Sequence, residues 1–153
     1  MRISAKADYA VRAAAELAAA QPDGRPVKGE HHAAAQTIPQ NFLENILADL
    51  RNAGLVQTRR GAEGGYALTR PASEIALADV LRAVEGPLAA VQGTRPEGLR
   101  YRGAAARLPE VWVALRANVR DVLERVTLAD LAAGELPERV ADLTNPADAW
   151  QPH

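Results

Sequence analysis

Side chains able to hydrogen-bond the edges of nucleic-acid bases cluster in one short stretch of the chain. Gln40 and Asn41 are followed by Glu44 and Asn45 in the sequence QNFLEN. Glutamine and asparagine amides match N6 and N7 of adenine, and a glutamate carboxylate accepts a hydrogen bond from N4 of cytosine. These residue types near the start of a helix predict a helix that enters the major groove of DNA. The alternative is an ordinary polar helix face, in which Gln40 serves the helix cap.

Two adjacent cations form the second candidate group. Arg59 and Arg60 stand directly before a glycine-rich turn in the sequence RRGAEGGYALTR. An arginine on a hairpin can enter a narrow minor groove, where the negative potential of DNA is enhanced. The glycines suggest a tip that approaches the sugar–phosphate backbone closely. A solvated turn whose charges serve solubility is the alternative, but the succession of polar helix, glycine stop and basic hairpin favours DNA binding.

Apolar spacing predicts the helix that must position the first group. Its apolar residues recur at helical intervals and form a face opposite the polar one: Phe42, Leu43, Ile46, Leu47 and Leu50. We expect a capping box in which Thr37 is the first residue and Gln40 the fourth, with Pro39 in the first turn. Gly54 ends the helix as a left-handed cap.

The remaining pattern predicts a mainly α-helical chain with a small β-hairpin. The other expected elements are helices over 4–20 and 29–36, strands over 55–60 and 65–69, and helices over 75–85 and 108–126. A further short helix begins at Thr127, whose spacing from Asp130 resembles a capping box. Three helices followed by a hairpin is the order of a winged helix-turn-helix. The fold class we predict is therefore a winged helix-turn-helix domain plus a long dimerisation helix.

These elements divide the chain into four expected regions. They are a winged helix-turn-helix DNA-binding domain over 1–86, an effector or sensor loop without cysteines over 87–107, a dimerisation helix with a C-terminal helix over 108–143, and a flexible tail over 144–153.

The long helix suggests association between two copies of the chain. Its apolar residues are spaced by threes and fours: Val111, Trp112, Leu115, Val119, Val122, Leu123 and Val126. A small alanine-rich domain offers little surface to cover such a stripe, which would otherwise remain an exposed apolar patch. We therefore expect a homodimer formed through these residues. The alternative is a helix that packs back on its own subunit.

Composition and charge exclude several other classes of protein. The chain of 153 residues has a net charge of −1 and no cysteine, so disulfides and thiolate metal sites are absent. Residues 1–70 carry nine basic and seven acidic residues, so the positive charge lies on the predicted DNA-binding half. No apolar run is long enough for a membrane span, and Asp8 and Glu16 interrupt any signal-peptide pattern, so a cytoplasmic location is expected. GAEGG lacks the spacing of a phosphate loop, and no catalytic triad is readable, so we do not expect an enzyme.

The sequences ISAKADYAVRAAAELA and FLENILADLRNAGLVQTRRGAEGGYALTRPASEIALADVLRAVEG resemble the Rrf2 family of transcriptional regulators, which includes IscR, NsrR and CymR. The resemblance implies a homodimer that binds double-stranded DNA. It places DNA contacts on the recognition helix and wing at Gln40, Asn41, Phe42, Glu44, Asn45 and Arg60. It also implies phosphate contacts from an N-terminal segment at Arg2, Ser4, Lys6 and Tyr9. By analogy with cysteine-free relatives, repression of sulfur or cysteine metabolism is the expected role. A winged-helix protein–protein interaction module without a DNA site is the alternative.

The expected effector loop departs from the family pattern. Many members hold an iron–sulfur cluster on three cysteines here, but this loop has none, so no cofactor or metal is expected. Arginine pairs bidentately with carboxylates and other anions. A bound small anion could therefore involve Gln92, Arg95, Arg100, Tyr101 and Arg102. A flexible linker with solvated arginines is the alternative, and a protein effector is a third.

Adjacent histidines are a second departure. The resemblance implies an aliphatic core residue where His32 stands and a polar surface residue at His31. Neighbouring side chains on a helix point in different directions, so the pair is poorly placed to chelate one ion. A buried histidine is most often hydrogen-bonded within the core, and that is the role we expect for His32.

Overall fold

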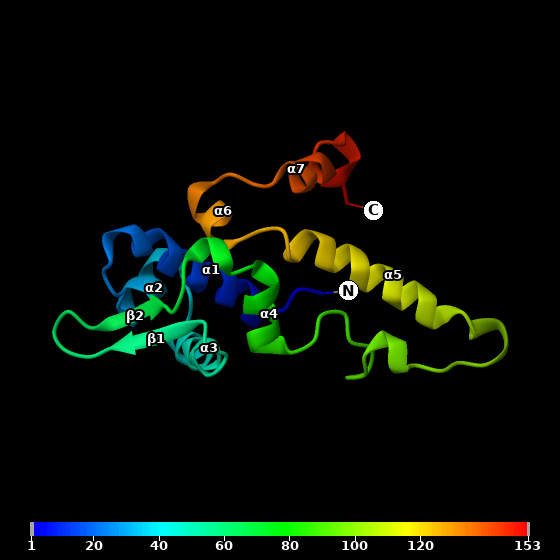
Figure 1. Ribbon diagram of the computed structural model, residues 1–153, viewed down its shortest axis with the longest axis horizontal. Helices are drawn as coiled ribbons and strands as arrows, with labels where there is room; N and C mark the ends of the chain where they lie inside the picture. The colour runs from blue at the N-terminus through cyan, green and yellow to red at the C-terminus, as the bar shows by residue number, and fades with distance from the viewer. Residues whose placement is uncertain (1, 153) are drawn as a thin grey trace.

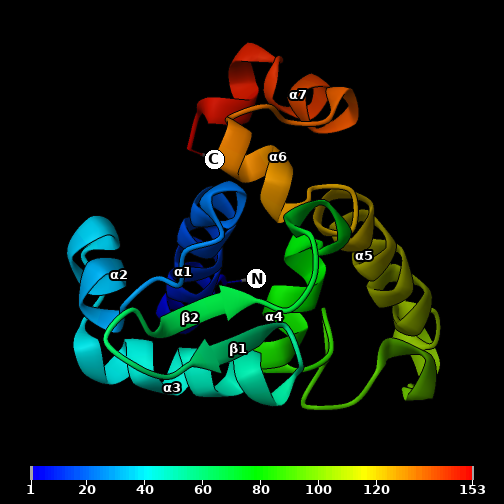
Figure 2. The same cartoon turned by 60° about the vertical axis from the view of Figure 1, so that its left-hand side comes forward.

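Helix α1, residues Ala5–Ala20, packs against α2, α3, α4, α6 and β2. The computed structural model describes residues 2–152. Ser4 starts α1, because its hydroxyl oxygen accepts a hydrogen bond from the Ala7 amide at 3.0 Å. The buried face of α1 is mostly alanine, and these small side chains let the neighbouring helices approach closely. An alanine-rich sequence is thus well suited to the central helix (Figures 1 and 2).

Helices α2, Gly29–Gln36, and α3, Gln40–Asn52, form the helix-turn-helix. Thr37 closes α2 in the left-handed conformation, with φ of 54° and its amide bonded to the Ala33 carbonyl. The predicted capping box at the start of α3 is wrong, because Pro39 is the residue before the helix and no side chain caps it. Gln40 is therefore exposed and not engaged as a cap.

The end of α3 agrees with the predicted left-handed glycine. Gly54 has φ of 74°, and the Leu55 amide donates to the Leu50 carbonyl at 2.9 Å. The chain then forms strands β1, Val56–Arg59, and β2, Gly65–Leu68. They pair antiparallel with Val56 opposite Leu68, and both are slightly shorter than predicted.

A third extended segment joins the hairpin. Val27 and Tyr66 exchange two backbone hydrogen bonds of 2.8 Å, which tie the connection between α1 and α2 to the outer edge of β2. A Cβ atom on Gly65 would lie 2.6 Å from the Val27 carbonyl oxygen, and one on Gly64 would lie 2.4 Å from the Arg59 carbonyl oxygen. These two glycines are therefore required by backbone packing within the protein, rather than by approach to DNA as the sequence suggested.

The hairpin leads into α4, Leu77–Glu85, after a short 3₁₀ turn at Ala72–Glu74. Residues beyond the long helix return to pack beside α4. The Leu77 amide donates to the Val126 carbonyl and the Leu128 amide to the Ile75 carbonyl, both at 2.9 Å. Helix α6, Leu128–Ala133, then packs on α1, and the predicted Thr127–Asp130 capping box is present. Ile75 and Leu128 are both fully buried, so α6 completes the core of the N-terminal domain although it lies outside 1–86.

Helix α5, Leu108–Leu123, extends away from the helices and hairpin of this domain (Figure 1). It contains no buried residue. It ends three residues before the predicted end, and Val126 lies in the connection that follows. The loop between α4 and α5 includes two 3₁₀ turns, Pro96–Gly98 and Gly103–Ala105.

The chain ends with α7, Glu138–Thr144, and a 3₁₀ turn at Ala147–Trp150. The Trp150 indole N–H donates to the Thr144 carbonyl at 2.7 Å, so the expected flexible tail contains one ordered turn. Across residues 2–152, no helix is both long enough and apolar enough to cross a membrane.

Candidate nucleic-acid interface

Helix α3 has the division of faces that a recognition helix requires. Leu43, Ile46, Leu47 and Leu50 are buried beneath it, and none is more than 1% exposed. The predicted base-reading residues are all exposed: Gln40, Asn41, Glu44 and Asn45. Because the first amides of a helix have no partner within it, this end also offers N–H donors to phosphate. The Asn45 amide donates back to the Asn41 carbonyl at 3.1 Å, which is a local contact that a base edge can replace.

Phe42 occupies a different position from its polar neighbours. Its ring meets that of Tyr9 edge-on, with centroids 5.6 Å apart and an angle of 75° between the planes. The guanidinium of Arg12 lies over the Tyr9 ring, 4.7 Å from the ring centroid. Phe42 remains 41% exposed. The ring therefore helps to fix α3 on α1 while part of it still faces outward.

The N-terminal segment is mostly engaged in contacts within the chain. Ser4 caps α1 and also hydrogen-bonds Glu85. The Lys6 ammonium lies 2.7 Å from the Asp49 carboxylate, which links α1 to α3. Arg2 is exposed. Of the predicted phosphate contacts here, Arg2 makes no hydrogen bond or ion pair with the other described residues, whereas Ser4 and Lys6 would have to exchange existing partners to bind phosphate.

The positive charge at the wing, the β1–β2 hairpin, comes from more residues than Arg59 and Arg60. Arg59 and Arg60 line a groove of about 420 Å³ together with Arg25 and Lys28 from the connection between α1 and α2, and Glu63 is the acidic residue in its wall. Arg59 donates to the Gly24 carbonyl at 3.2 Å, which holds the two segments together. The sequence does not indicate a role for Arg25 and Lys28, because the Val27–Tyr66 pairing that brings them here joins distant parts of the chain. Two cations in the turn sequence DGRPVKG were the available signal.

Lys28 connects the wing with the recognition helix. Besides lining the wing groove, it lines a second groove of about 320 Å³ with Gln40 and Glu44 at the start of α3 and Tyr66 on β2. The hairpin and α3 lie side by side in both views (Figures 1 and 2). Gln40 and Glu44 among the predicted base-reading residues thus line one groove, and the wing cations line an adjoining one. Asn41 and Asn45 line neither groove but are exposed on the same helix.

His32 is buried without the hydrogen bonds expected for it. The residue is 0% exposed, and neither Nδ1 nor Nε2 has a partner. Removal from water lowers the pKa of His32 to about 4, against an opposing effect of Glu16 and a smaller lowering effect of His31. His31 is exposed. Within residues 2–152, no group of three histidine, cysteine, aspartate or glutamate side chains is arranged to hold a metal ion.

The predicted dimerisation residues fall into three environments. Val111 and Leu115 are exposed on α5, at 56% and 38%. Four are half-buried: Trp112, Val119, Val122 and Leu123. Val126 is only 3% exposed within its own subunit and lies after the end of α5, so it is not part of the free face as predicted. The Trp112 indole N–H is shielded from solvent without a partner.

The Rrf2 family model, described as an iron-dependent transcriptional regulator, matches residues 3–134. A helix-turn-helix-type transcriptional regulator of Mycobacterium tuberculosis is 54% identical over 145 residues, covering 95% of this chain and 89% of the relative. The structure of CymR, the global cysteine regulator of Bacillus subtilis, is 35% identical, covers 88% of this chain and 98% of its own, and superposes with a TM-score of 0.74. The IscR of T. potens is 31% identical with a TM-score of 0.71, covering 88% of each chain.

Proposed function

The chain belongs to the Rrf2 family of DNA-binding transcriptional regulators, and from that premise we propose that it binds specific DNA sites as a homodimer. Its family and its relatives are transcriptional regulators rather than enzymes, in agreement with the sequence analysis. The fold is the expected one, a mainly helical chain with a small hairpin like the CymR and IscR structures.

One observation carries the proposed DNA surface. The start of α3 and the wing cations border two grooves that share Lys28. A duplex laid along this surface can meet polar side chains from α3 in the major groove while the cations contact the adjacent backbone or minor groove. Neither group alone distinguishes a DNA site from an ordinary polar surface, but their adjacency supports one shared ligand.

The residues divide by the chemistry that each can supply. Gln40, Asn41, Glu44 and Asn45 carry the donors and acceptors that distinguish bases, so we assign them to sequence readout. Arg60 and its neighbours Arg59, Arg25 and Lys28 are assigned to phosphates or to the minor groove. Phe42 and Tyr9 contribute indirectly by holding α3 in position.

The proposed dimer rests on α5. A helix of 16 residues in which no side chain is fully buried in its own subunit has an apolar stripe left to cover. Val111 and Leu115 lie one turn apart on one exposed face, and we propose that this face meets the same face of a second copy. A two-fold axis there would present two α3 helices to half-sites about 34 Å apart, one turn of DNA.

The residues of this chain do not fit the iron–sulfur cluster of its family. It has no cysteine, and the part of the chain over 2–152 holds no cluster of alternative metal ligands.

We propose that the chain represses its targets, because a dimer bound across a promoter blocks RNA polymerase without further chemistry. Genes of cysteine metabolism are the proposed targets, supported by the likeness to the B. subtilis cysteine regulator. Deletion of the gene for this chain should raise the transcript levels of the genes that it binds, and a fall in those levels would contradict repression.

The DNA proposal is tested by binding titrations on genomic fragments selected by the wild-type protein. Arg60→Ala should weaken binding at all selected sites, because a cation next to the phosphates is lost. It should also reduce the slope of log affinity against log salt by about 0.9 for each phosphate contact removed. Arg107→Ala is the matched control, since that side chain is 85% exposed at the start of α5, away from the wing.

Two results would support the alternative of a protein-interaction module. One is equally weak binding of all genomic fragments by the wild type. The other is a salt slope that Arg60→Ala and Arg107→Ala change by the same amount.

A further inference from the structure

A cleft of about 490 Å³ lies between α4 and α5. Its walls combine one side chain from α4, the turn after α4, the 3₁₀ turn of the loop, and two side chains from α5: Arg82, Gly86, Pro87, Leu88, Arg95, Glu97, Arg116 and Arg120. Only Arg95 belongs to the loop set that the sequence suggested for anion binding. Arg100 instead donates to the carbonyls of Glu97 and Leu99 in its own loop. The helices therefore supply most of the charge in this cleft.

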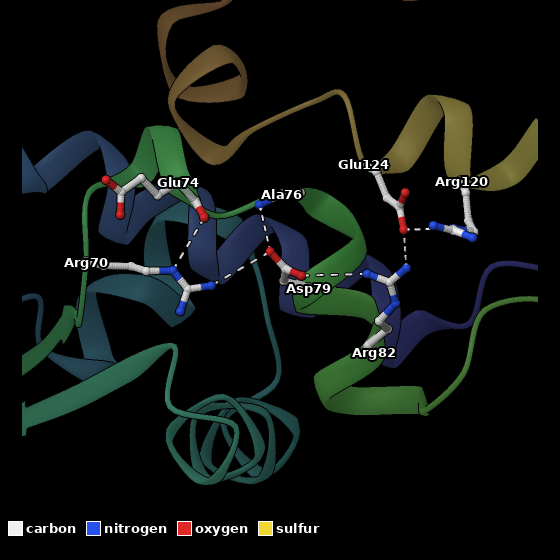
Figure 3. Close-up of polar contacts among 7 residues, drawn as sticks. All are labelled: Arg70, Glu74, Ala76, Asp79, Arg82, Arg120 and Glu124. Atoms are coloured by element: carbon white, nitrogen blue, oxygen red, sulfur yellow. Dashed lines mark hydrogen bonds and ion pairs between the residues drawn. The ribbon is translucent and has the colours of Figure 1, made fainter.

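The cleft has an excess of positive charge in a chain whose net charge is −1. Arg82 and Arg120 share the carboxylate of Glu124 (Figure 3), with the Arg120 Nε atom 2.9 Å from it. Arg116 lies 2.5 Å from the carboxylate of Glu97. A backbone hydrogen bond, and then the hydrogen bond and charge of Arg116, lower the pKa of Glu97, so this carboxylate is charged near neutral pH.

Counting these partners leaves two positive charges. The cleft has four arginines, and Glu97 and Glu124 neutralise two of them. Asp79 does not alter this balance when Arg70 is counted with it. Its carboxylate lies between Arg82 at 3.7 Å and Arg70 at 3.8 Å, and Arg70, which is outside the cleft, adds the positive charge that Asp79 cancels (Figure 3).

Many guanidinium donors in the cleft remain available. Each guanidinium has five N–H groups in a planar fork that matches carboxylate or phosphate oxygens. Arg116 uses only one terminal nitrogen, and Arg120 uses only Nε. Within residues 2–152, the Arg95 guanidinium makes no hydrogen bond or salt bridge and is exposed. A ligand could therefore bind without breaking the existing ion pairs.

We propose that this cleft binds a small molecule carrying two negative charges on oxygen. Its volume lies within the range of small-molecule sites, roughly 300–1,000 Å³. Its excess charge matches a dianion, and its available donors come from guanidinium groups on both sides. Phosphate esters and dicarboxylates share this chemistry, and the experiment below separates them.

The position of the cleft gives the ligand a regulatory role, which rests on the function proposed above. Arg82 belongs to α4, which packs on α1 and α3, whereas Arg116 belongs to α5, the proposed dimer helix. A dianion held between them fixes the angle of α5 to the DNA-binding domain. In a dimer that angle sets the separation of the two α3 helices, so ligand binding selects whether both half-sites can be contacted together.

The test is calorimetric titration of the full chain, without DNA, at constant ionic strength. The probes are glycerol 2-phosphate and succinate, with acetate and glycerol as the monoanionic and neutral controls. We expect saturable binding of at least one dianion and of neither control. Arg95→Gln should weaken that binding about tenfold, the loss of one charge-assisted contact. This substitution removes no internal partner and should leave the melting temperature unchanged. Arg107→Gln, a change of the same type outside the cleft, should bind as the wild type does.

The preferred probe identifies the anion type, since binding of glycerol 2-phosphate alone indicates phosphate esters and binding of succinate alone indicates dicarboxylates. The proposal is overturned if neither dianion binds, or if Arg95→Gln and Arg116→Gln both bind with wild-type affinity. Because no DNA is present, either of these results leaves the DNA-binding proposal standing.

Discussion

His32 combines complete burial with two unpartnered ring nitrogens. An unsatisfied buried polar group costs about 1–3 kcal/mol, so this residue weakens the second helix of the helix-turn-helix at every pH. The imidazole is neutral near pH 7, because desolvation lowers its pKa to about 4. Glu16 acts in the opposite direction and His31 in the same direction, but neither outweighs burial.

The pH dependence of stability follows from this lowered pKa. The folded state takes up the proton near pH 4, whereas an unfolded histidine takes it up near its model value of 6.5. Stability is therefore unaffected above pH 6.5 and is lost as pH falls from 6.5 toward 4. We expect the free energy of unfolding of the wild type to fall by about 2–3 kcal/mol between pH 7 and pH 4.5. The His32→Leu variant should not show this fall, and urea denaturation measures both.

His31→Leu is the matched control, because His31 is exposed and should leave the pH dependence intact. If the wild type and His32→Leu lose stability in parallel as the pH falls, the titration of His32 is not the cause.

The sequence predicts the exposed side chains of α3 but not the full charge of the wing. Asn41 and Glu44 were assigned to one face because a helix repeats every 3.6 residues and their neighbours Leu43 and Leu47 are apolar. Arg25 and Lys28 carry no such period. They reach the wing through the pairing of Val27 with Tyr66, and long-range pairing leaves no local signal.

For the helices and strands, the sequence predicts their order and type better than the residues at which they begin and end. The glycine stop after α3 was predicted because a left-handed cap has a strong residue preference. The start of α3 was not, because Thr37 suits a capping box by sequence but adopts the left-handed conformation that ends α2. The apolar pattern likewise continues to Val126, although α5 stops at Leu123 and Val126 is buried in the following connection.

The proposed dimer depends on helix α5. We expect Leu115→Glu to leave the chain monomeric at micromolar concentration, because a charge would replace apolar surface at the centre of the proposed contact. Sedimentation velocity measures the change directly. Folding should be retained, since Leu115 is 38% exposed within one subunit.

Ala117→Glu is the control on the same helix. Residues two positions apart point to opposite sides of a helix, and Ala117 is also exposed. This variant should remain dimeric. A dimeric Leu115→Glu variant, or a wild type that is monomeric throughout, would remove α5 as the interface.

In the whole molecule, the chain leaves the N-terminal domain to form α5 and then returns to the same domain. The chain leaves the N-terminal domain after α4, forms α5, and returns so that Leu128 fills the core beside Ile75. Sequence showed no sign of this return, because the backbone pairing joins residues about 50 positions apart. It matters for function, since this pairing ties the C-terminal end of α5 to the DNA-binding domain and the arginine-lined cleft lies between α4 and α5.

We propose above that two copies of the chain present α3 and the wing to one duplex together. Hydroxyl-radical footprinting of the wild-type protein on a selected genomic fragment tests it most directly. We expect two protected patches on the same side of the DNA, about 34 Å apart and related by a two-fold axis. A single protected patch, or protection spread evenly along the fragment, would contradict it.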